Sequence, residues 1–189
     1  MISIRVHGRG GQGVITAAEL IALAGFKSGL QTQALPAFGV ERTGAPIQAF
    51  ARLSDKPILT REHIYEPQII IVQDPTLLES LDIMAGANQQ TKLIVNSPKT
   101  AKGIFNQIKS EKIQSLAPME KNITTVDASS IAFRIFGKNL VNTALLGALA
   151  KTTKQISITA LKAAITEKFT SKGQATIDRN ITAALETFK

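Results

Sequence analysis

The chain has 189 residues, of which 44% are hydrophobic and 19% are charged, so we expect one globular domain spanning residues 1–189. No apolar run is long enough to cross a membrane, and the first residues lack the pattern of a signal peptide, which predicts a cytoplasmic protein without membrane contact. Because it has no cysteine and only two histidines, the chain cannot form disulfides or hold thiolate-bound iron–sulfur clusters, and no metal site is predicted.

The positive charge is concentrated in the second half of the chain. The net charge is +8, yet residues 1–89 contain 7 Lys and Arg against 8 Asp and Glu, whereas residues 90–189 contain 15 against 6. A basic half can bind nucleic acid, an acidic partner or an anionic ligand, or it can be a solvated lysine-rich surface, which we favour. The single tyrosine and the absence of tryptophan argue against a surface that stacks nucleic-acid bases.

The chain begins with the pattern of a β-strand, a glycine-rich turn and an α-helix. Alternating apolar residues predict a strand over 2–6, and an amphipathic helix is predicted over 15–26, with Gly29 at its end. Glycines let the backbone approach a ligand closely, and a helix start presents unpaired N–H groups to an anion. The turn therefore predicts a site for an anion or cofactor, made of Gly8, Arg9, Gly10, Gly11, Gln12 and Gly13.

The spacing of these glycines matches the dinucleotide fingerprint, although a tight turn without a ligand has the same pattern. Arg9 and Gln12 add hydrogen-bond donors, and His7 lies at the strand end, where α/β proteins place their sites. A nicotinamide cofactor also needs an acidic residue about 20 positions further on. Residues 31–36 contain no carboxylate and no clear apolar second strand, so a nicotinamide site is not predicted.

The remainder of the chain alternates between strand and helix patterns. Strands are predicted at short apolar runs, over residues 47–53, 69–72, 92–95 and 123–126. Helices are predicted where apolar residues recur every three or four positions, over residues 139–151, 158–169 and 175–188. Apolar and polar residues alternate over 47–53, which suits an antiparallel strand. Ser157 is the predicted N-cap of the helix over 158–169. The class is α/β, with a three-layer α/β/α arrangement, a Rossmann-like, mostly parallel (mixed) sheet and the glycine loop at its carboxyl edge.

Two further polar features have more than one interpretation. Asp74 follows a predicted strand and precedes Pro75, so we interpret it as the N-cap of a helix that reaches Leu81, in preference to a catalytic carboxylate. The segment 34–46 contains two prolines and two glycines, which predicts a loop of fixed shape. The adjacent Glu41 and Arg42 in that loop are either a surface ion pair of little energetic value or a functional pair.

A series of motifs in a fixed order carries a family resemblance. They are His7-Gly-Arg-Gly-Gly-Gln-Gly-Val14, Phe38-Gly-Val-Glu-Arg-Thr-Gly-Ala-Pro46, Ala49-Phe50-x-Arg52, Asp55-Lys-Pro-Ile58, Tyr65-Glu-Pro67, Ile71-Val-Gln-Asp-Pro-Thr-Leu-Leu78 and Asn142-Thr-Ala-Leu-Leu-Gly-Ala-Leu149. Together they resemble the gamma subunits of 2-oxoacid:ferredoxin oxidoreductases, most closely those of pyruvate:ferredoxin oxidoreductase (pyruvate synthase). The resemblance extends from residue 1 to about residue 188.

The resemblance implies an enzyme that converts pyruvate, coenzyme A and oxidised ferredoxin to acetyl-CoA, carbon dioxide and reduced ferredoxin. It implies that alpha, beta and delta partner subunits, or fused equivalents, hold thiamine diphosphate, Mg²⁺ and iron–sulfur clusters and that ferredoxin or flavodoxin meets the complex. This chain, which also lacks a thiamine motif, would bind no cofactor alone, be inactive alone, shape the shared site and help bind coenzyme A. No catalytic residue is assigned, and the predicted substrate or interface residues are Phe38, Glu41, Arg42 and Gly44.

One position departs from the family, whose members commonly have two arginines where this chain has Arg42 and Thr43. The 2-oxoacid therefore stays open between pyruvate, 2-oxoglutarate and a branched-chain acid. A stand-alone nucleotide-binding protein is an alternative, against which the missing ribose carboxylate counts. A basic nucleic-acid-binding module is another, against which the few aromatic residues count, and we expect no contact with nucleic acid.

Overall fold

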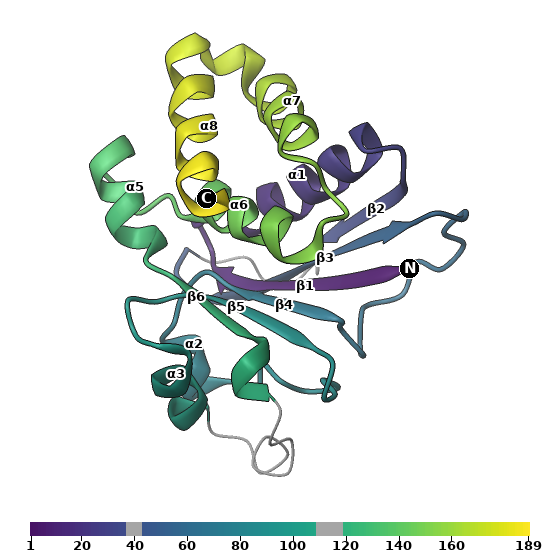
Figure 1. Ribbon diagram of the computed structural model, residues 1–189, viewed down its shortest axis with the longest axis vertical. Coiled ribbons are helices and arrows are strands. Elements are labelled where there is room, and N and C mark those ends of the chain that lie inside the picture. Colours follow the sequence, from purple (N-terminus) through teal and green to yellow (C-terminus); the bar gives the residue numbers. More distant parts are fainter. Residues whose placement is uncertain (37–42, 109–118) are drawn as a thin grey trace.

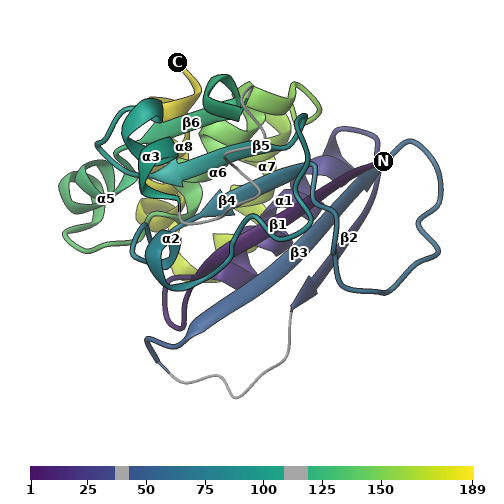
Figure 2. The ribbon, with the colours of Figure 1, turned by 90° about the horizontal axis from the view of Figure 1, so that it is seen from below.

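The computed structural model describes residues 1–36, 43–108 and 119–189 and centres on a six-stranded sheet. Figure 2 shows the strands side by side in the order β2-β3-β1-β4-β5-β6. Their bounds are β1 (Ile2–Arg9), β2 (Gln31–Pro36), β3 (Pro46–Ser54), β4 (Ile69–Val72), β5 (Lys92–Asn96) and β6 (Ile123–Val126). The pairs β1–β4, β4–β5 and β5–β6 are parallel, and β3 is antiparallel to both of its neighbours. The predicted mostly parallel, mixed sheet, including an antiparallel strand over 47–53, is confirmed.

Helices cover both faces of this sheet. In the described residues they are α1 (Val14–Lys27), α2 (Leu77–Ser80), α3 (Ala101–Gln107), α5 (Ala128–Phe136), α6 (Asn142–Thr153), α7 (Ile158–Phe169) and α8 (Gln174–Phe188), with the 3-10 turns η1 (Met119–Asn122) and η2 (Thr170–Lys172). Figure 1 shows α1, α5, α6, α7 and α8 on one side of the sheet and α2 and α3 on the other. The predicted three-layer α/β/α arrangement is confirmed.

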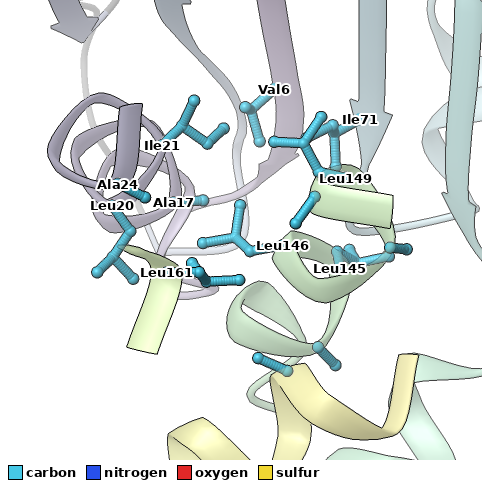
Figure 3. Packing of buried hydrophobic residues seen from close by; sticks show 14 of the residues in the cluster. Val6, Ala17, Leu20, Ile21, Ala24, Ile71, Leu145, Leu146, Leu149 and Leu161 are labelled. Carbon is cyan, nitrogen blue, oxygen red and sulfur yellow. The ribbon is translucent and has the colours of Figure 1, made fainter. Parts of the chain in front are cut away.

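The larger of two cores lies between the sheet and the helices α1, α6, α7 and α8. In Figure 3, Val6 and Ile71 of the sheet face Ile21 of α1 and Leu149 of α6. The side chains of α6 are buried from Asn142 to Ala150, because this helix has the sheet on one side and α8 on the other. Strand β4 is buried along its whole length, as expected of a central parallel strand covered on both faces.

One glycine permits the close packing of α6 against α8. A Cβ at Gly147 would lie under 3.0 Å from the carbonyl oxygen of Ala184 and from the hydroxyl of Thr187. The Thr187 hydroxyl also donates a hydrogen bond of 2.5 Å to the carbonyl oxygen of Ala144. Any larger residue at position 147 would separate the two helices.

The structure corrects three element predictions. A second strand, β2, does exist over 31–36; it lies at the edge of the described sheet, pairs there with β3 alone and is half-exposed, so its residues need no apolar run. Helix α2 ends at Ser80 and does not reach Leu81. Helix α6 begins at Asn142, three residues after its predicted start.

On the second face of the sheet, two buried arginines hold irregular chain segments in place. Arg5 Nη2 donates to the carbonyl oxygens of Ile83 and Ala85, at 2.9 and 2.7 Å. Arg52 Nη2 donates to the carbonyl oxygen of Glu62 at 2.7 Å. The guanidinium groups thus satisfy backbone acceptors in a part of the chain without helix or strand.

Candidate functional site

The glycine loop leaves β1 at the carboxyl edge of the parallel strands and enters α1, as predicted. Strand β1 continues through Gly8 and Arg9, beyond the predicted end at Val6. Gly8 is required for packing, because a Cβ there would lie 2.5 Å from Val14 Cγ2 and 3.2 Å from Gln73 Oε1. The first glycine therefore lets the helix start approach the sheet closely.

The next glycines shape the loop through their backbone conformation. Gly11 and Gly13 have left-handed φ angles of 91° and 73°, which disfavour any side chain. A Cβ at Gly13 would lie 2.7 Å from Asn142 Nδ2, whereas a Cβ at Gly11 would meet no atom within 4 Å. Gly13 is therefore closed in by α6, and Gly11 faces open space.

The N-terminus of α1 is available to an anion. Gly13 is the N-cap residue, no side chain of the described residues caps the helix, and no acidic residue lies in its first turn. Its first N–H groups are therefore left for another acceptor, and the helix dipole adds positive potential there.

Arg9 and Gln12, predicted as ligand donors, have their side chains bound to Asp74. Arg9 Nε and Gln12 Nε2 donate to Asp74 Oδ2 at 3.0 and 3.1 Å. Gln12 Oε1 accepts the Arg9 N–H at 2.8 Å. These two side chains therefore hold the loop, and direct binding of a ligand by them stays a prediction.

The N-cap residue of α2 is Thr76, not Asp74 as predicted, and the Asp74 carboxylate serves the glycine loop and the turn before this helix. Its Oδ1 accepts from the Thr76 hydroxyl at 2.6 Å and the Thr76 N–H at 3.0 Å. Burial raises the pKa of Asp74, but the hydrogen bonds from Thr76 and Gln12 and the charge of Arg9 outweigh it, so the pKa is lowered. An ionised Asp74 thus clamps two loops together.

The described end of the second family motif, at Gly44 and Ala45, is hydrogen-bonded to the glycine loop. Gly44 has a φ of 83°, and its N–H donates to the carbonyl oxygen of Gly10 at 3.1 Å, while the Gly10 N–H donates to the carbonyl oxygen of Ala45 at 2.9 Å. Arg9 Nη1 adds a hydrogen bond of 3.1 Å to the carbonyl oxygen of Gly44. Phe38, Glu41 and Arg42 lie outside the described residues.

Two cavities meet at Gly11, Gly13 and Thr16. The first, of about 400 Å³, is lined by the glycine loop, the first turn of α1, Thr43 and Ile47. The second, of about 370 Å³, opens toward α6, η2 and α8 and is lined by Lys138, Lys172 and Arg179 among others. The sequence interpretation did not identify the second cavity.

His7 does not belong to this site. It lies on the face of β1 opposite Val6, is 2% exposed, and its Nε2 accepts a hydrogen bond of 3.1 Å from Arg5 Nε. Burial, and then the charge of Arg5, lower the pKa of His7 to about 3. A neutral, buried imidazole below the sheet is not positioned to act at the glycine loop.

The described ranges contain neither a candidate metal site nor a candidate membrane-spanning helix. No three His, Cys, Asp or Glu side chains in residues 1–36, 43–108 and 119–189 gather to hold a metal ion. Within the same ranges, no helix has the length and apolar character needed to span a bilayer.

Comparison with known proteins identifies the class to which this fold and loop belong. The sequence profile of the family described as pyruvate ferredoxin/flavodoxin oxidoreductase matches residues 3–189. The common subunit gamma of the pyruvate/ketoisovalerate oxidoreductases of Thermococcus kodakarensis is 44% identical over 188 residues, which cover 100% of this chain and 96% of that protein. Subunit PorC of the pyruvate synthase of Methanosarcina barkeri is 44% identical over 165 residues, 87% of this chain and 85% of that protein.

Solved structures share the fold. Pyruvate oxidoreductase subunit PORC of Thermotoga maritima has a TM-score of 0.78 at 32% identity, over 99% of this chain and 94% of that chain. The 2-oxoglutarate:ferredoxin oxidoreductase of Magnetococcus marinus, solved with 2-oxoglutarate, coenzyme A and succinyl-CoA bound, has a TM-score of 0.73 at 20% identity, over 98% of this chain and 30% of that chain. At that identity the likeness shows the fold alone.

The chain belongs to the pyruvate ferredoxin/flavodoxin oxidoreductase family. Within that family it is a gamma subunit of the PorC type, part of a 2-oxoacid:ferredoxin oxidoreductase. Its relatives are named as subunits of pyruvate/ketoisovalerate oxidoreductases and of pyruvate synthase.

Proposed function

We propose that this chain binds coenzyme A for the oxidative decarboxylation of a 2-oxoacid, with pyruvate as the first candidate, to acyl-CoA, carbon dioxide and reduced ferredoxin. Thiamine diphosphate with Mg²⁺ and iron–sulfur clusters supply the decarboxylation and electron-transfer chemistry. In this proposal they reside on alpha, beta and delta partners, since the chain has no cysteine to ligate a cluster. Ferredoxin or flavodoxin accepts electrons from the complex.

The observation that carries the proposal is the first cavity at the uncapped start of α1. Coenzyme A contains a diphosphate, and a glycine-lined cavity with free N–H groups and a positive helix dipole suits such a group. Gly11 lines the cavity and leaves room above its Cα. The ion pair of Arg9 with Asp74 at 3.0 Å holds the loop in this shape.

We assign the choice of 2-oxoacid to the partner subunits. The relative from Thermococcus kodakarensis is named as a subunit common to pyruvate and ketoisovalerate oxidoreductases, so one gamma chain serves two acyl substrates there. Coenzyme A is the substrate that those reactions share. A gamma subunit that binds coenzyme A, and does not contact the acyl group, can be shared in this way.

The proposal is tested with a Gly11→Val variant in the purified complex. The branched side chain would adopt a strained φ of 91° and would protrude into both cavities. We expect the Kd of coenzyme A, measured by calorimetry, to rise at least tenfold, while the complex still assembles.

Gly29→Val is the matched control. Gly29 also has a positive φ, of 87°, and open space around its Cα, but it lies past the far end of α1. An unchanged coenzyme A affinity in Gly11→Val, or an equal loss in both variants, would disprove a role for the loop in coenzyme A binding.

A further inference from the structure

The second cavity has a composition that differs sharply from the first. Three of the residues that line it are the cations Lys138, Lys172 and Arg179, and none is acidic. Lys138 lies between α5 and α6, Lys172 ends η2, and Arg179 belongs to α8. Part of the excess charge of the second half of the chain is thus gathered beside the N-terminal glycine loop.

These cations lack a counter-charge within the described part of the chain. None of the three forms an ion pair with a carboxylate of the described residues. The ammonium of Lys172 lies 5.8 Å from the centre of the Phe169 ring, which holds it at the cavity by a cation–π contact. Neighbouring positive charges repel one another, and an anion between them would relieve that repulsion.

Asn142 supplies an independent indication of a ligand. It is 7% exposed and lines the cavity. Its Oδ1 accepts the Thr143 N–H at 3.0 Å, but its Nδ2, which faces Gly13, donates to no described residue. The neighbouring Asn180 has both side-chain atoms bonded, to Thr143 and Thr176. This amide N–H group is therefore free to donate to a ligand oxygen in the cavity.

We propose that this second cavity is a phosphomonoester subsite that binds the 3′-phosphate of coenzyme A. The inference rests on the proposed function, in which the first cavity takes the diphosphate. A phosphomonoester carries close to two negative charges and three acceptor oxygens, which match three cations and one amide donor. Because the cavities meet at Gly11, Gly13 and Thr16, one molecule with two phosphate groups can occupy both.

The test compares coenzyme A with dephospho-coenzyme A, which lacks only the 3′-phosphate. In the assembled complex, we expect the double variant Lys172→Gln/Arg179→Gln to weaken coenzyme A binding at least tenfold. It should change dephospho-coenzyme A binding less than twofold. The unmodified complex should prefer coenzyme A by a similar factor. Lys162→Gln, which removes a charge from the exposed face of α7, should alter neither affinity.

Each outcome decides between the two proposals. Equal weakening of both ligands, no weakening of either, or an unmodified complex that does not distinguish them would overturn the 3′-phosphate subsite. The proposed function survives those results if Gly11→Val still weakens dephospho-coenzyme A. If the unmodified complex binds neither ligand, or Gly11→Val affects neither, the function itself fails.

Discussion

At the scale of single residues, His7 makes the stability of the chain depend on pH. Its folded-state pKa of about 3 lies below the ordinary value of 6.5. Between these values the unfolded chain binds a proton that the folded chain does not. The free energy of unfolding is therefore undiminished above pH 6.5 and falls by up to about 1.4 kcal/mol per pH unit below it.

We predict that His7→Gln removes this contribution. A glutamine can still accept the Arg5 hydrogen bond but does not titrate. The loss of stability between pH 7 and pH 5, measured by urea unfolding, should shrink by about 2 kcal/mol relative to the unmodified chain. The exposed His63 is the only other histidine, and His63→Gln should keep the full loss. An unchanged pH slope in His7→Gln would show that the imidazole ionises in the folded state.

Residues of the candidate site were predictable where the signal is local. The glycines at 8, 11 and 13 follow one another within six positions, and their conformations and close contacts confirm that the loop has a special shape. The part played by Asp74 was not predictable, since its partners Arg9 and Gln12 are more than 60 positions away. An Asp-Pro pair is typical of a helix start and gives no indication of partners far away in the sequence.

At the scale of elements, burial explains which predictions were right. Strand β4 and helices α7 and α8 pack against the core, so apolar residues mark them in the sequence, as a continuous run in the strand and every three or four positions in the helices. Edge strand β2 has no such constraint. The second cavity draws its lining from helices and turns far apart in the sequence, so no local pattern predicted it.

Replacing glycine with alanine at two helical positions, Gly147 and Gly103, should have opposite effects on the free energy of unfolding. Gly147→Ala would force its Cβ against α8 and should lower the free energy of unfolding by about 1–3 kcal/mol. Gly103→Ala in α3 would place its Cβ 3.5 Å from its nearest neighbours, an ordinary contact. It should raise stability by about 0.5–1 kcal/mol through helix propensity. Thermal unfolding of both variants checks this, and a stabilising Gly147→Ala would contradict the described helix contact.

At the scale of the whole molecule, the chain separates two kinds of chemistry. The glycine loop and the cationic cavity gather donors and positive charge at one edge of the sheet, which suits a phosphate-rich substrate. The chain has no cysteine that could ligate an iron–sulfur cluster for electron transfer. In the proposed function, the complex combines one coenzyme A-binding subunit with partners that determine the acyl substrate and carry the electrons.

Thr43 gives the sharpest test of that division. It lines the first cavity at the position where the family resemblance implies a second arginine. We predict that Thr43→Arg lowers the KM for coenzyme A at least twofold, because a cation is added beside the diphosphate. Thr43→Gln, which lacks the charge, should not do so.

The same variant should leave the choice of 2-oxoacid unchanged. The ratio of kcat/KM for pyruvate to that for 2-oxoglutarate, measured in the assembled complex, should stay within twofold of the unmodified value. A new cation that reached the acyl substrate would favour 2-oxoglutarate, whose second carboxylate it would attract. A shift of tenfold or more, about 1.4 kcal/mol, toward 2-oxoglutarate would mean that this chain contacts the acyl group, and the assignment of 2-oxoacid choice to the partners would be wrong.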